Sequence, residues 1–390
     1  MMIYADHAAT TALSKRALAA VLPFLQGKYG NASSVYAFGK RARQAIERAR
    51  RQVADAVGAA ASEIVFTAGG SEGNNMVLRG AADRAWRVGR RAHIVVSTIE
   101  HPSVLAPCRA LERLGARIDY VPVSQGGRVA AESVAAVLSE ETCLVSVMLA
   151  NNEVGTVQDI ATIAELLKER GVPFHTDAVQ AVGHIPVDVK ALGVTYLTAS
   201  GHKFGGMKGT GFLWQREGAE LPPLISGGGQ ERGHRAGTEN TAGVVALGEA
   251  LTESVERMQE DAGRLRGLVA YTLQMIQREV PEVRVHGAGK EHLPGLLNIG
   301  IPGARGESLV HLLDLKGICV SAASACSAGA DVPSHVLRAM GYGAREAMEA
   351  LRISYGRENT QEEAQRVAEE IVCAVQKIRA LSGRETHAVI

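Results

Sequence analysis

The sequence lacks a long apolar run, an excess of either charge and a paired cysteine motif. No stretch of its 390 residues approaches the roughly 18 apolar residues of a membrane-spanning helix, so we expect no membrane span. The formal net charge of +1 gives no electrostatic reason to expect nucleic acid or an anionic membrane as the main partner. The first residues lack the basic and apolar regions of a signal peptide.

The cysteines are few and scattered. None of them forms a C-x-x-C pair, and the number is odd, which argues against a disulfide framework or a zinc site. We therefore expect no metal, and a reducing cytoplasm fits best. The five cysteines are Cys108, Cys143, Cys319, Cys326 and Cys373.

The remaining composition is that of an ordinary soluble globular protein, with 46% hydrophobic and 21% charged residues. The length exceeds the usual limit for one hydrophobic core, so two domains are expected. Short β-rich runs alternate with helical patterns, which predicts βαβ units around a largely parallel sheet. The predicted strands are residues 63–67, 93–98, 117–123, 142–149, 172–177, 196–200 and 211–214. The predicted helices between them include 103–114, 131–138 and 160–170.

The pattern changes after about residue 240. A long helix is predicted over 241–279, followed by short strands at 283–286, 296–301 and 319–321 and an amphipathic helix at 362–381. We interpret this part as a smaller α+β domain. The large domain is placed at residues 15–258, and the small domain at 1–14 and 259–390.

Five polar or glycine-rich segments directly follow predicted strands. In an open parallel sheet, ligands bind beyond the carboxyl ends of the strands, so these segments should converge on one site. They are residues 68–75, 99–102, 150–155, 176–180 and 201–206.

Two charged residues in these segments suit the chemistry of a ring cofactor. Lys203, in SGHK at 200–203, lies among small residues, where desolvation lowers the pKa of an amine and makes it a nucleophile able to form a Schiff base. Asp177, in FHTD at 174–177, needs a cationic partner, and a protonated pyridine nitrogen would be one. Taken alone, a solvated loop lysine and a helix N-cap are the simpler interpretations.

The other strand-end segments carry further candidates. The glycines of residues 67–75 would let backbone amides approach an anion at a helix N-terminus, although a tight turn capped by Ser71 fits as well. His101 can stack on a flat ring or move protons near neutral pH, and Asn152 follows the next strand. Individually, an ordinary histidine and a simple turn would explain these two residues.

Cys326 and Arg352 lie later in the chain. Small residues flank Cys326, which suits an accessible thiol, whereas Cys143 and Cys373 are expected to be packed. Arg352 alternates with apolar neighbours as in a strand, and its guanidinium would match a substrate carboxylate. A small buried cysteine and a structural salt bridge are the simpler alternatives.

Together these motifs resemble the cysteine desulfurases, which are class-V aminotransferases within fold type I of the pyridoxal-phosphate enzymes. The similarity runs through nearly the whole chain, from YADHAATT at 4–11 and GNASS at 30–34 to LRIS at 351–354. It implies an α/β fold with a mainly parallel sheet in the large domain and a smaller α+β domain. The stretch 326–337 resembles the longer loop of the branch that serves iron–sulfur cluster assembly. Tyr36 departs from the histidine of many relatives.

The resemblance also implies a role for each motif residue. Lys203 would hold pyridoxal 5′-phosphate as a covalent aldimine and later move the α-proton of the substrate, while Cys326 would take the sulfur as a persulfide. His101 would stack on the ring and relay protons, and Arg352, helped by Asn31, would bind the cysteine carboxylate. The residues expected to bind the cofactor are Gly70, Ser71, His101, Asn152, Asp177, Gln180, Ser200, His202 and Lys203, together with Thr238 from the neighbouring subunit of a homodimer.

The implied activity is removal of sulfur from L-cysteine, which gives L-alanine and a persulfide on Cys326 for an acceptor protein such as an iron–sulfur scaffold. No membrane or direct nucleic-acid contact is expected. A selenocysteine lyase or an aminotransferase of the same fold is the alternative, and an aminotransferase would need no cysteine at 326. A catalytically idle sulfur-relay subunit is a further alternative, against which the intact Lys203 and Asp177 argue. The sequence leaves the acceptor open among iron–sulfur assembly, tRNA thiolation and DNA sulfur modification.

Overall fold

The computed structural model describes residues 2–287, 289, 291–322 and 332–381, so Cys326 lies outside the described residues. Its larger part is built on a seven-stranded sheet with the order β2-β8-β7-β6-β5-β3-β4. Only β8 runs antiparallel to its neighbours in this sheet, so the prediction of a mainly parallel sheet is confirmed. The strands are β2 (Ile64–Thr67), β3 (His93–Ser97), β4 (Arg117–Val121), β5 (Thr142–Ser146), β6 (Phe174–Asp177), β7 (Tyr196–Ser200) and β8 (Gly211–Gln215).

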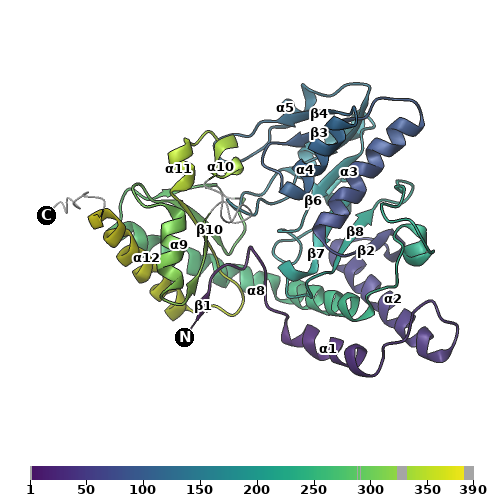
Figure 1. Ribbon diagram of the computed structural model, residues 1–390, viewed down its shortest axis with the longest axis horizontal. Helices are drawn as coiled ribbons and strands as arrows, with labels where there is room; N and C mark the ends of the chain where they lie inside the picture. Colours follow the sequence, from purple (N-terminus) through teal and green to yellow (C-terminus); the bar gives the residue numbers. More distant parts are fainter. Residues whose placement is uncertain (1, 288, 290, 323–331, 382–390) are drawn as a thin grey trace.

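Helices cover both faces of this sheet (Figure 1). Alternate residues of β3 show why the centre of the strand is apolar on both faces. Ile94 and Val96 pack in one buried cluster with residues of α3 and α4, whereas Val95 belongs to a second cluster that includes residues of α2, α6 and α8. The helices and 3-10 turns of this part are α1 (Lys15–Gln26), α2 (Ala37–Val57), η1 (Ala61–Glu63), α3 (Gly70–Arg87), α4 (Pro102–Arg113), α5 (Ala131–Ala135), α6 (Ile160–Glu169), α7 (Val189–Leu192), η2 (Gly201–Lys203) and η3 (Gln230–Gly233).

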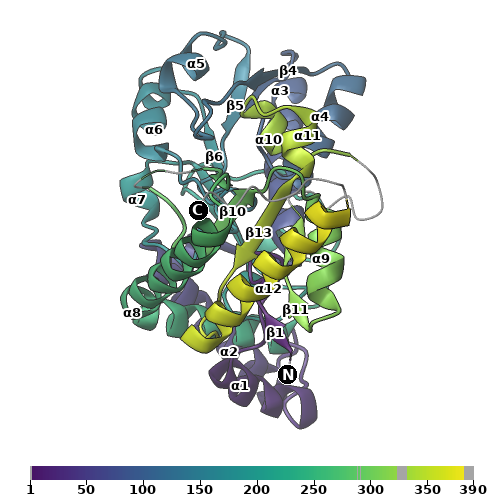
Figure 2. The ribbon, with the colours of Figure 1, turned by 90° about the vertical axis from the view of Figure 1, so that its left-hand side faces the viewer.

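The smaller part is built on an antiparallel sheet of β12 (Ser321–Ala322), β13 (Ala350–Ser354), β10 (Leu296–Gly300) and β9 (Arg284–Val285). Figure 2 shows β13 and β10 behind α12. A separate parallel pair joins β1 (Ile3–Tyr4) to β11 (Ile318–Cys319), so the first residues of the chain lie in the smaller part. Its remaining helices are α9 (Gly306–Asp314), α10 (His335–Ala339), α11 (Ala344–Met348) and α12 (Gln361–Leu381).

The long helix α8 (Thr241–Glu279) connects the two parts and has the bounds that the sequence predicts. Its buried residues up to Leu251 pack in the core of the larger part, and those from Leu265 onward pack in the core of the smaller part. The proposed domain bounds of 15–258 and 259–390 stay a prediction.

Two expectations from the sequence were wrong. The predicted strand at 319–321 is two strands, because β11 pairs with β1 while β12 pairs with β13. Cys373 is exposed rather than packed, because the buried face of α12 is formed by residues such as Ile371 and Val375, and Cys373 lies between them on the outer face.

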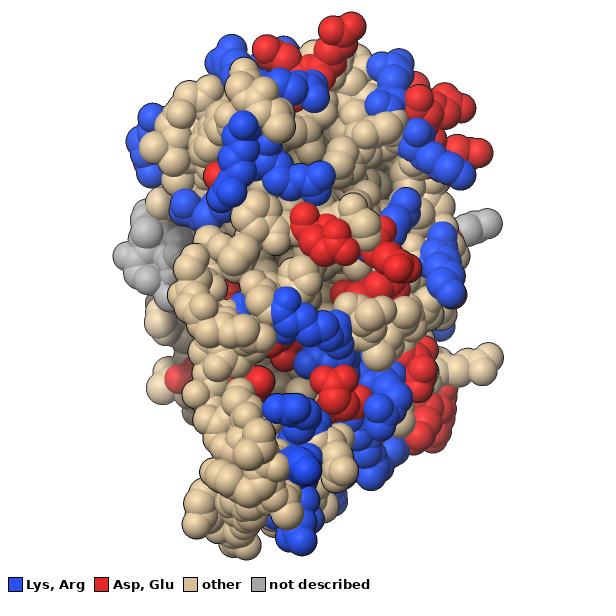
Figure 3. Space-filling view, turned by 90° about the vertical axis from the view of Figure 1, so that its right-hand side faces the viewer, with Lys and Arg blue, Asp and Glu red and all other residues tan. Residues whose placement is uncertain are grey.

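None of the described helices is both long and apolar enough to cross a membrane. On the face that Figure 3 shows, basic and acidic side chains are interspersed. That distribution agrees with the formal net charge of +1.

Candidate active site

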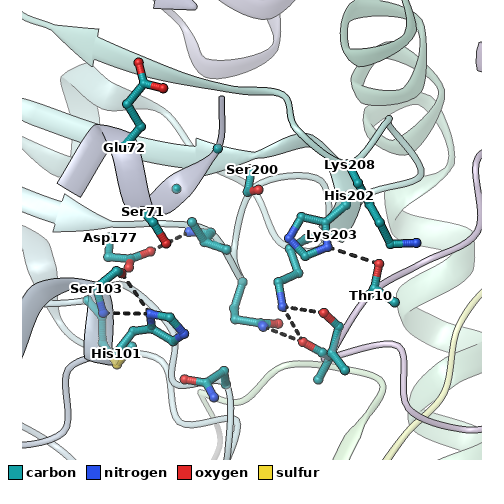
Figure 4. A pocket seen from close by; sticks show the side chains of 18 of the residues that line it. Thr10, Ser71, Glu72, His101, Ser103, Asp177, Ser200, His202, Lys203 and Lys208 are labelled. Atoms are coloured by element: carbon teal, nitrogen blue, oxygen red, sulfur yellow. Dashed lines mark hydrogen bonds between the residues drawn. The ribbon is translucent and has the colours of Figure 1, made fainter. Parts of the chain in front are cut away.

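A cavity of about 680 Å³ lies beyond the carboxyl ends of β2, β3, β5, β6 and β7 (Figure 4). All five predicted strand-end segments contribute to it, as expected for parallel strands whose carboxyl ends meet at one edge of a sheet. The lining includes Ala8, Ala9, Thr10, Gly70, Ser71, Glu72, His101, Ser103, Asn152, Asp177, Gln180, Ser200, His202, Lys203, Lys208 and Arg352.

Lys203 lies in η2, directly after β7, and its side chain enters the cavity. The Nζ amine donates to the carbonyl oxygens of Ala8 at 2.6 Å and Ala9 at 2.9 Å. The ring of His184 is hydrogen-bonded to the backbone oxygen of Lys203, with Nε2 2.8 Å away. The amine is therefore held at a defined position rather than in a solvated loop.

Asp177 ends β6 and is only 4% exposed. Its Oδ1 accepts from the backbone N–H of Val179 at 3.0 Å, but residues 179–184 form turns and the next helix is α7, so the interpretation of Asp177 as a helix N-cap is wrong. Its Oδ2 accepts from Asn74 Nδ2 at 2.7 Å. Both of these donors are neutral, so this buried carboxylate, which lines the cavity, is suited to a cationic ligand group.

The N-terminus of α3 forms another wall of the cavity. Ser71 is the second residue of the helix and Gly69 is its N-cap, so the alternative in which Ser71 caps a turn is wrong. A Cβ on Gly70 would lie 2.6 Å from Val179 Cγ2, which means that only glycine lets the backbone approach so closely here. The first N–H groups of a helix have no intrahelical partner and favour an anion. His202 lies nearby, and burial with neighbouring lysines lowers its pKa to about 4.

His101 is the N-cap of α4, where its Nδ1 accepts from the backbone N–H of Ser103 at 3.1 Å. Burial lowers the pKa of His101, the positive charge of Lys203 lowers it further, and Asp177 opposes these effects. The ring lines the cavity beside Asp177. Its role in stacking and proton transfer stays a prediction.

Arg352 comes from β13, in the smaller part, and its side chain is 3% exposed. Nη2 pairs with Asp6 Oδ1 at 2.7 Å, and Nη1 donates to the Asn152 backbone oxygen at 2.9 Å. The structural salt bridge that the sequence left open is present, yet the guanidinium still lines the cavity. Its Nε is buried without a hydrogen-bond partner among the described residues.

The structure does not bring every predicted residue to this cavity. Asn31 and Thr238 are exposed and are absent from the lining. Asn74, Ser103 and Asp6 contact the predicted residues directly, although no role was expected for them. Asn74 lies in the glycine-rich segment 67–75, and Asp6 lies in the motif at 4–11. Membership of these motifs is the only feature of the sequence that indicates a role for either residue.

The lining fits the parts of pyridoxal 5′-phosphate. The close backbone at Gly70 suits the phosphate, the buried Asp177 suits a protonated ring nitrogen, and the Lys203 amine suits the aldehyde carbon. Lys208 and Arg352 add positive charge to the same cavity. Among the described residues, no group of three or more His, Cys, Asp or Glu side chains could hold a metal ion.

Comparisons with known proteins agree with this site. The family model described as Aminotransferase class-V matches residues 3–367. The "Cysteine desulfurase IscS" of Dictyoglomus turgidum is 42% identical over 380 residues, which cover 97% of this chain and 96% of the relative. A solved structure described as a NifS-like protein has a TM-score of 0.91 at 36% identity and covers 97% of this chain and 100% of its own. The structure described as SspA in complex with cysteine has a TM-score of 0.80 at 34% identity, over 90% of this chain and 98% of its own.

The family model spans most of the chain, and the relatives exceed 40% identity over almost its full length. The chain therefore belongs to the class-V aminotransferases and, within them, to the cysteine desulfurases.

Proposed function

We propose that this chain removes sulfur from L-cysteine in the cavity around Lys203 and passes it to Cys326, with L-alanine as the other product. The observation that carries the proposal is the convergence of Lys203, Asp177 and Arg352 on one cavity. An amine, a buried carboxylate and a guanidinium then face the same bound molecule. The relative described as a complex with cysteine supports an amino-acid substrate.

Pyridoxal 5′-phosphate, when bound, supplies an electron sink for the bond-breaking steps. In our proposal Lys203 would hold the cofactor, Asp177 would pair with its ring nitrogen, and His101 would stack on the ring. Gln180 and Asn152 would hold the ring oxygen. The N-terminus of α3 would bind the phosphate, with Gly70, Ser71, Ser200 and His202.

The residues of the chain orient the substrate and move its protons. Arg352, held by Asp6, binds the cysteine carboxylate. A guanidinium typically binds a carboxylate through two parallel hydrogen bonds. The Lys203 amine would take the α-proton of the substrate. The thiolate of Cys326 attacks the substrate sulfur, so that a sulfur–sulfur bond forms while the carbon–sulfur bond breaks. The electron pair of the broken carbon–sulfur bond goes to the substrate carbon, which is protonated to give alanine.

We further propose a homodimer in which Thr238 reaches the phosphate site of the neighbouring subunit. Thr238 is exposed, and Arg235, three residues earlier, pairs with Glu72 in the first turn of α3 at 2.9 Å. That pair fixes the segment beside Glu72 at the start of α3, while Thr238 itself stays exposed and outside the cavity of its own subunit, where it can contact a second subunit. Leu18, Leu22 and other apolar side chains of α1 are exposed in the single chain, which supports a covered surface there. Asn31, which follows the same helix, is also exposed. We propose that Asn31 helps Arg352 to bind the carboxylate of the substrate.

The persulfide on Cys326 requires an acceptor. We propose an acceptor protein such as an iron–sulfur scaffold, in keeping with the IscS name of several relatives.

The test is the formation of alanine and sulfide from L-cysteine and a reductant. We expect Lys203→Ala to lower alanine formation by about 10²–10⁴-fold or more, the contribution typical of a positioned general base. Lys190→Ala, an exposed lysine on α7, is the matched control and should leave the rate unchanged. Alanine formation at the unaltered rate in Lys203→Ala would refute the proposal.

A further inference from the structure

We propose that Ser103 and Asn74 are positioning residues that hold His101 as a neutral imidazole with its single proton on Nε2. The inference rests on the proposed function, because it concerns the group that the ring presents to the cavity. The contacts that carry it all lie within the chain.

The first contact fixes the role of one ring nitrogen. The backbone N–H of Ser103 lies 3.1 Å from His101 Nδ1 and can only donate. Nδ1 must therefore accept, so it carries no proton. Because His101 is the N-cap of α4, this bond is part of the start of the helix and depends on no side chain.

The hydroxyl of Ser103 adds a second donor to the same nitrogen. Ser103 Oγ lies 2.8 Å from His101 Nδ1 and 2.9 Å from Asn74 Nδ2. An amide NH₂ can only donate, so Oγ accepts from Asn74 and has its own proton available for Nδ1. Figure 4 shows the ring with its Nδ1 edge turned toward Ser103 and the rest of the ring directed into the pocket.

The orientation of Asn74 is set by Asp177. Asn74 Nδ2 donates to Asp177 Oδ2 at 2.7 Å, and an ionised carboxylate has only acceptors. Rotating the amide would bring its oxygen against that carboxylate. Asn74 Oδ1 is buried without a partner among the described residues, so the observed orientation is kept although it leaves this oxygen unpaired. The chain of donors thus runs in one direction, from Asn74 through Ser103 to His101.

The surrounding charges agree with a neutral ring. Lys203 from η2 and His335 from α10 face His101 and disfavour its protonation, as does burial, whereas Asp177 from β6 favours it. The buried Glu100 precedes His101, and its backbone oxygen holds the ring of His335, with Nε2 3.0 Å away. The positive end of α4 also disfavours an imidazolium at its N-cap. His101 then presents an N–H donor to the cavity and not a free basic nitrogen.

The test is a nitrogen NMR measurement on the full-length, cofactor-loaded protein labelled with ¹⁵N-histidine. The His101 signals are assigned by their loss in His101→Gln. We expect an unprotonated Nδ1 and a protonated Nε2 at neutral pH. Ser103→Ala keeps the backbone donor but removes the hydroxyl, so the pKa of His101 should rise and the Nε2-protonated form should be less favoured. Ser103→Thr restores a hydroxyl and should restore both.

Ser139→Ala is the matched control, because Ser139 Oγ makes the same kind of bond to another histidine, with His93 Nδ1 3.0 Å away. It should leave the His101 signals unchanged. A proton on Nδ1 in the unaltered protein, or Ser103→Ala signals identical to it, would overturn the inference. Neither readout requires sulfide or alanine. If the tautomer is as expected and cysteine yields no alanine, only the proposed function fails.

Discussion

Arg352 and Asp6 form an ion pair across 346 positions of the sequence, with 2.7 Å between Nη2 and Oδ1. The pair joins the strand β13 to the first residues of the chain beside the cavity. Because Nη1 also donates to Asn152, the guanidinium is fixed in its plane before a substrate binds. A substrate carboxylate therefore meets a preorganised fork.

Arg352→Lys tests this arrangement. A lysine is a point charge and cannot keep both contacts while it binds a carboxylate with two parallel bonds. We expect kcat/KM for L-cysteine to fall by roughly 10- to 100-fold, mostly through KM, since about 1.5–3 kcal/mol is typical of a hydrogen bond to a charged group. The measurement is steady-state alanine formation, with Arg366→Lys on the exposed face of α12 as control. An unchanged KM would show that Arg352 serves only the ion pair.

Glu100→Gln tests a buried acid behind the cavity. Glu100 is fully buried, its Oε1 accepts from Ser97 and Met148, and Oε2 has no partner among the described residues. Burial raises its pKa from 4.5 to about 8. The folded protein therefore holds a proton that the unfolded chain releases, so this group lowers the free energy of unfolding as pH rises from about 4.5 to 8.

Glutamine imitates the protonated acid at every pH. We expect Glu100→Gln to be more stable than the unaltered protein at pH 8, by on the order of 2 kcal/mol, and to show a flatter pH dependence. Urea unfolding at several pH values measures both, and Glu165→Gln at an exposed position of α6 serves as the control. Equal slopes for Glu100→Gln and the unaltered protein would mean that Glu100 is ionised.

Arg50→Ala tests the buried ion pair between α2 and η3. Arg50 and Glu231 are each 4% exposed in their side chains and share two bonds, of 2.7 and 2.8 Å. Removing Arg50 leaves the Glu231 carboxylate buried without a counter-ion, so we expect the free energy of unfolding to fall by about 3–5 kcal/mol. Arg87→Ala breaks the exposed pair with Asp83 and should cost less than about 1 kcal/mol. Similar losses for both variants would contradict this account of Arg50.

Much of the sheet and of the site could be predicted from the sequence. The strand at 196–200 and the helix at 241–279 have the predicted bounds, because apolar runs and strong turn residues mark their ends. Lys203, Asp177 and His101 meet in one cavity because they lie at the carboxyl ends of β7, β6 and β3, which are parallel strands of one sheet.

Other features depend on contacts that no local pattern contains. The bond from Asn74 to Asp177 spans 103 positions, and that from Lys203 to Ala8 spans 195. The helices α1 and α2 were not predicted. Pro23 lies inside α1 and argues against a helix there in the sequence. The buried face of α2, from Ala42 to Val57, does repeat at three- and four-residue spacing, so this helix was missed although its pattern is present in the sequence.

The central claim is that sulfur leaves cysteine at the Lys203 cavity and is carried on Cys326. The most direct measurement locates the transferred sulfur. Cofactor-loaded protein is incubated with L-cysteine without reductant and alkylated, and its peptides are analysed by mass spectrometry. We expect one added sulfur atom on the Cys326 peptide. Cys373→Ala, which removes an exposed thiol, should not change this result, and Cys326→Ala should carry no persulfide. Added sulfur on Cys373, or sulfide release by Cys326→Ala at the unaltered rate, would contradict the account.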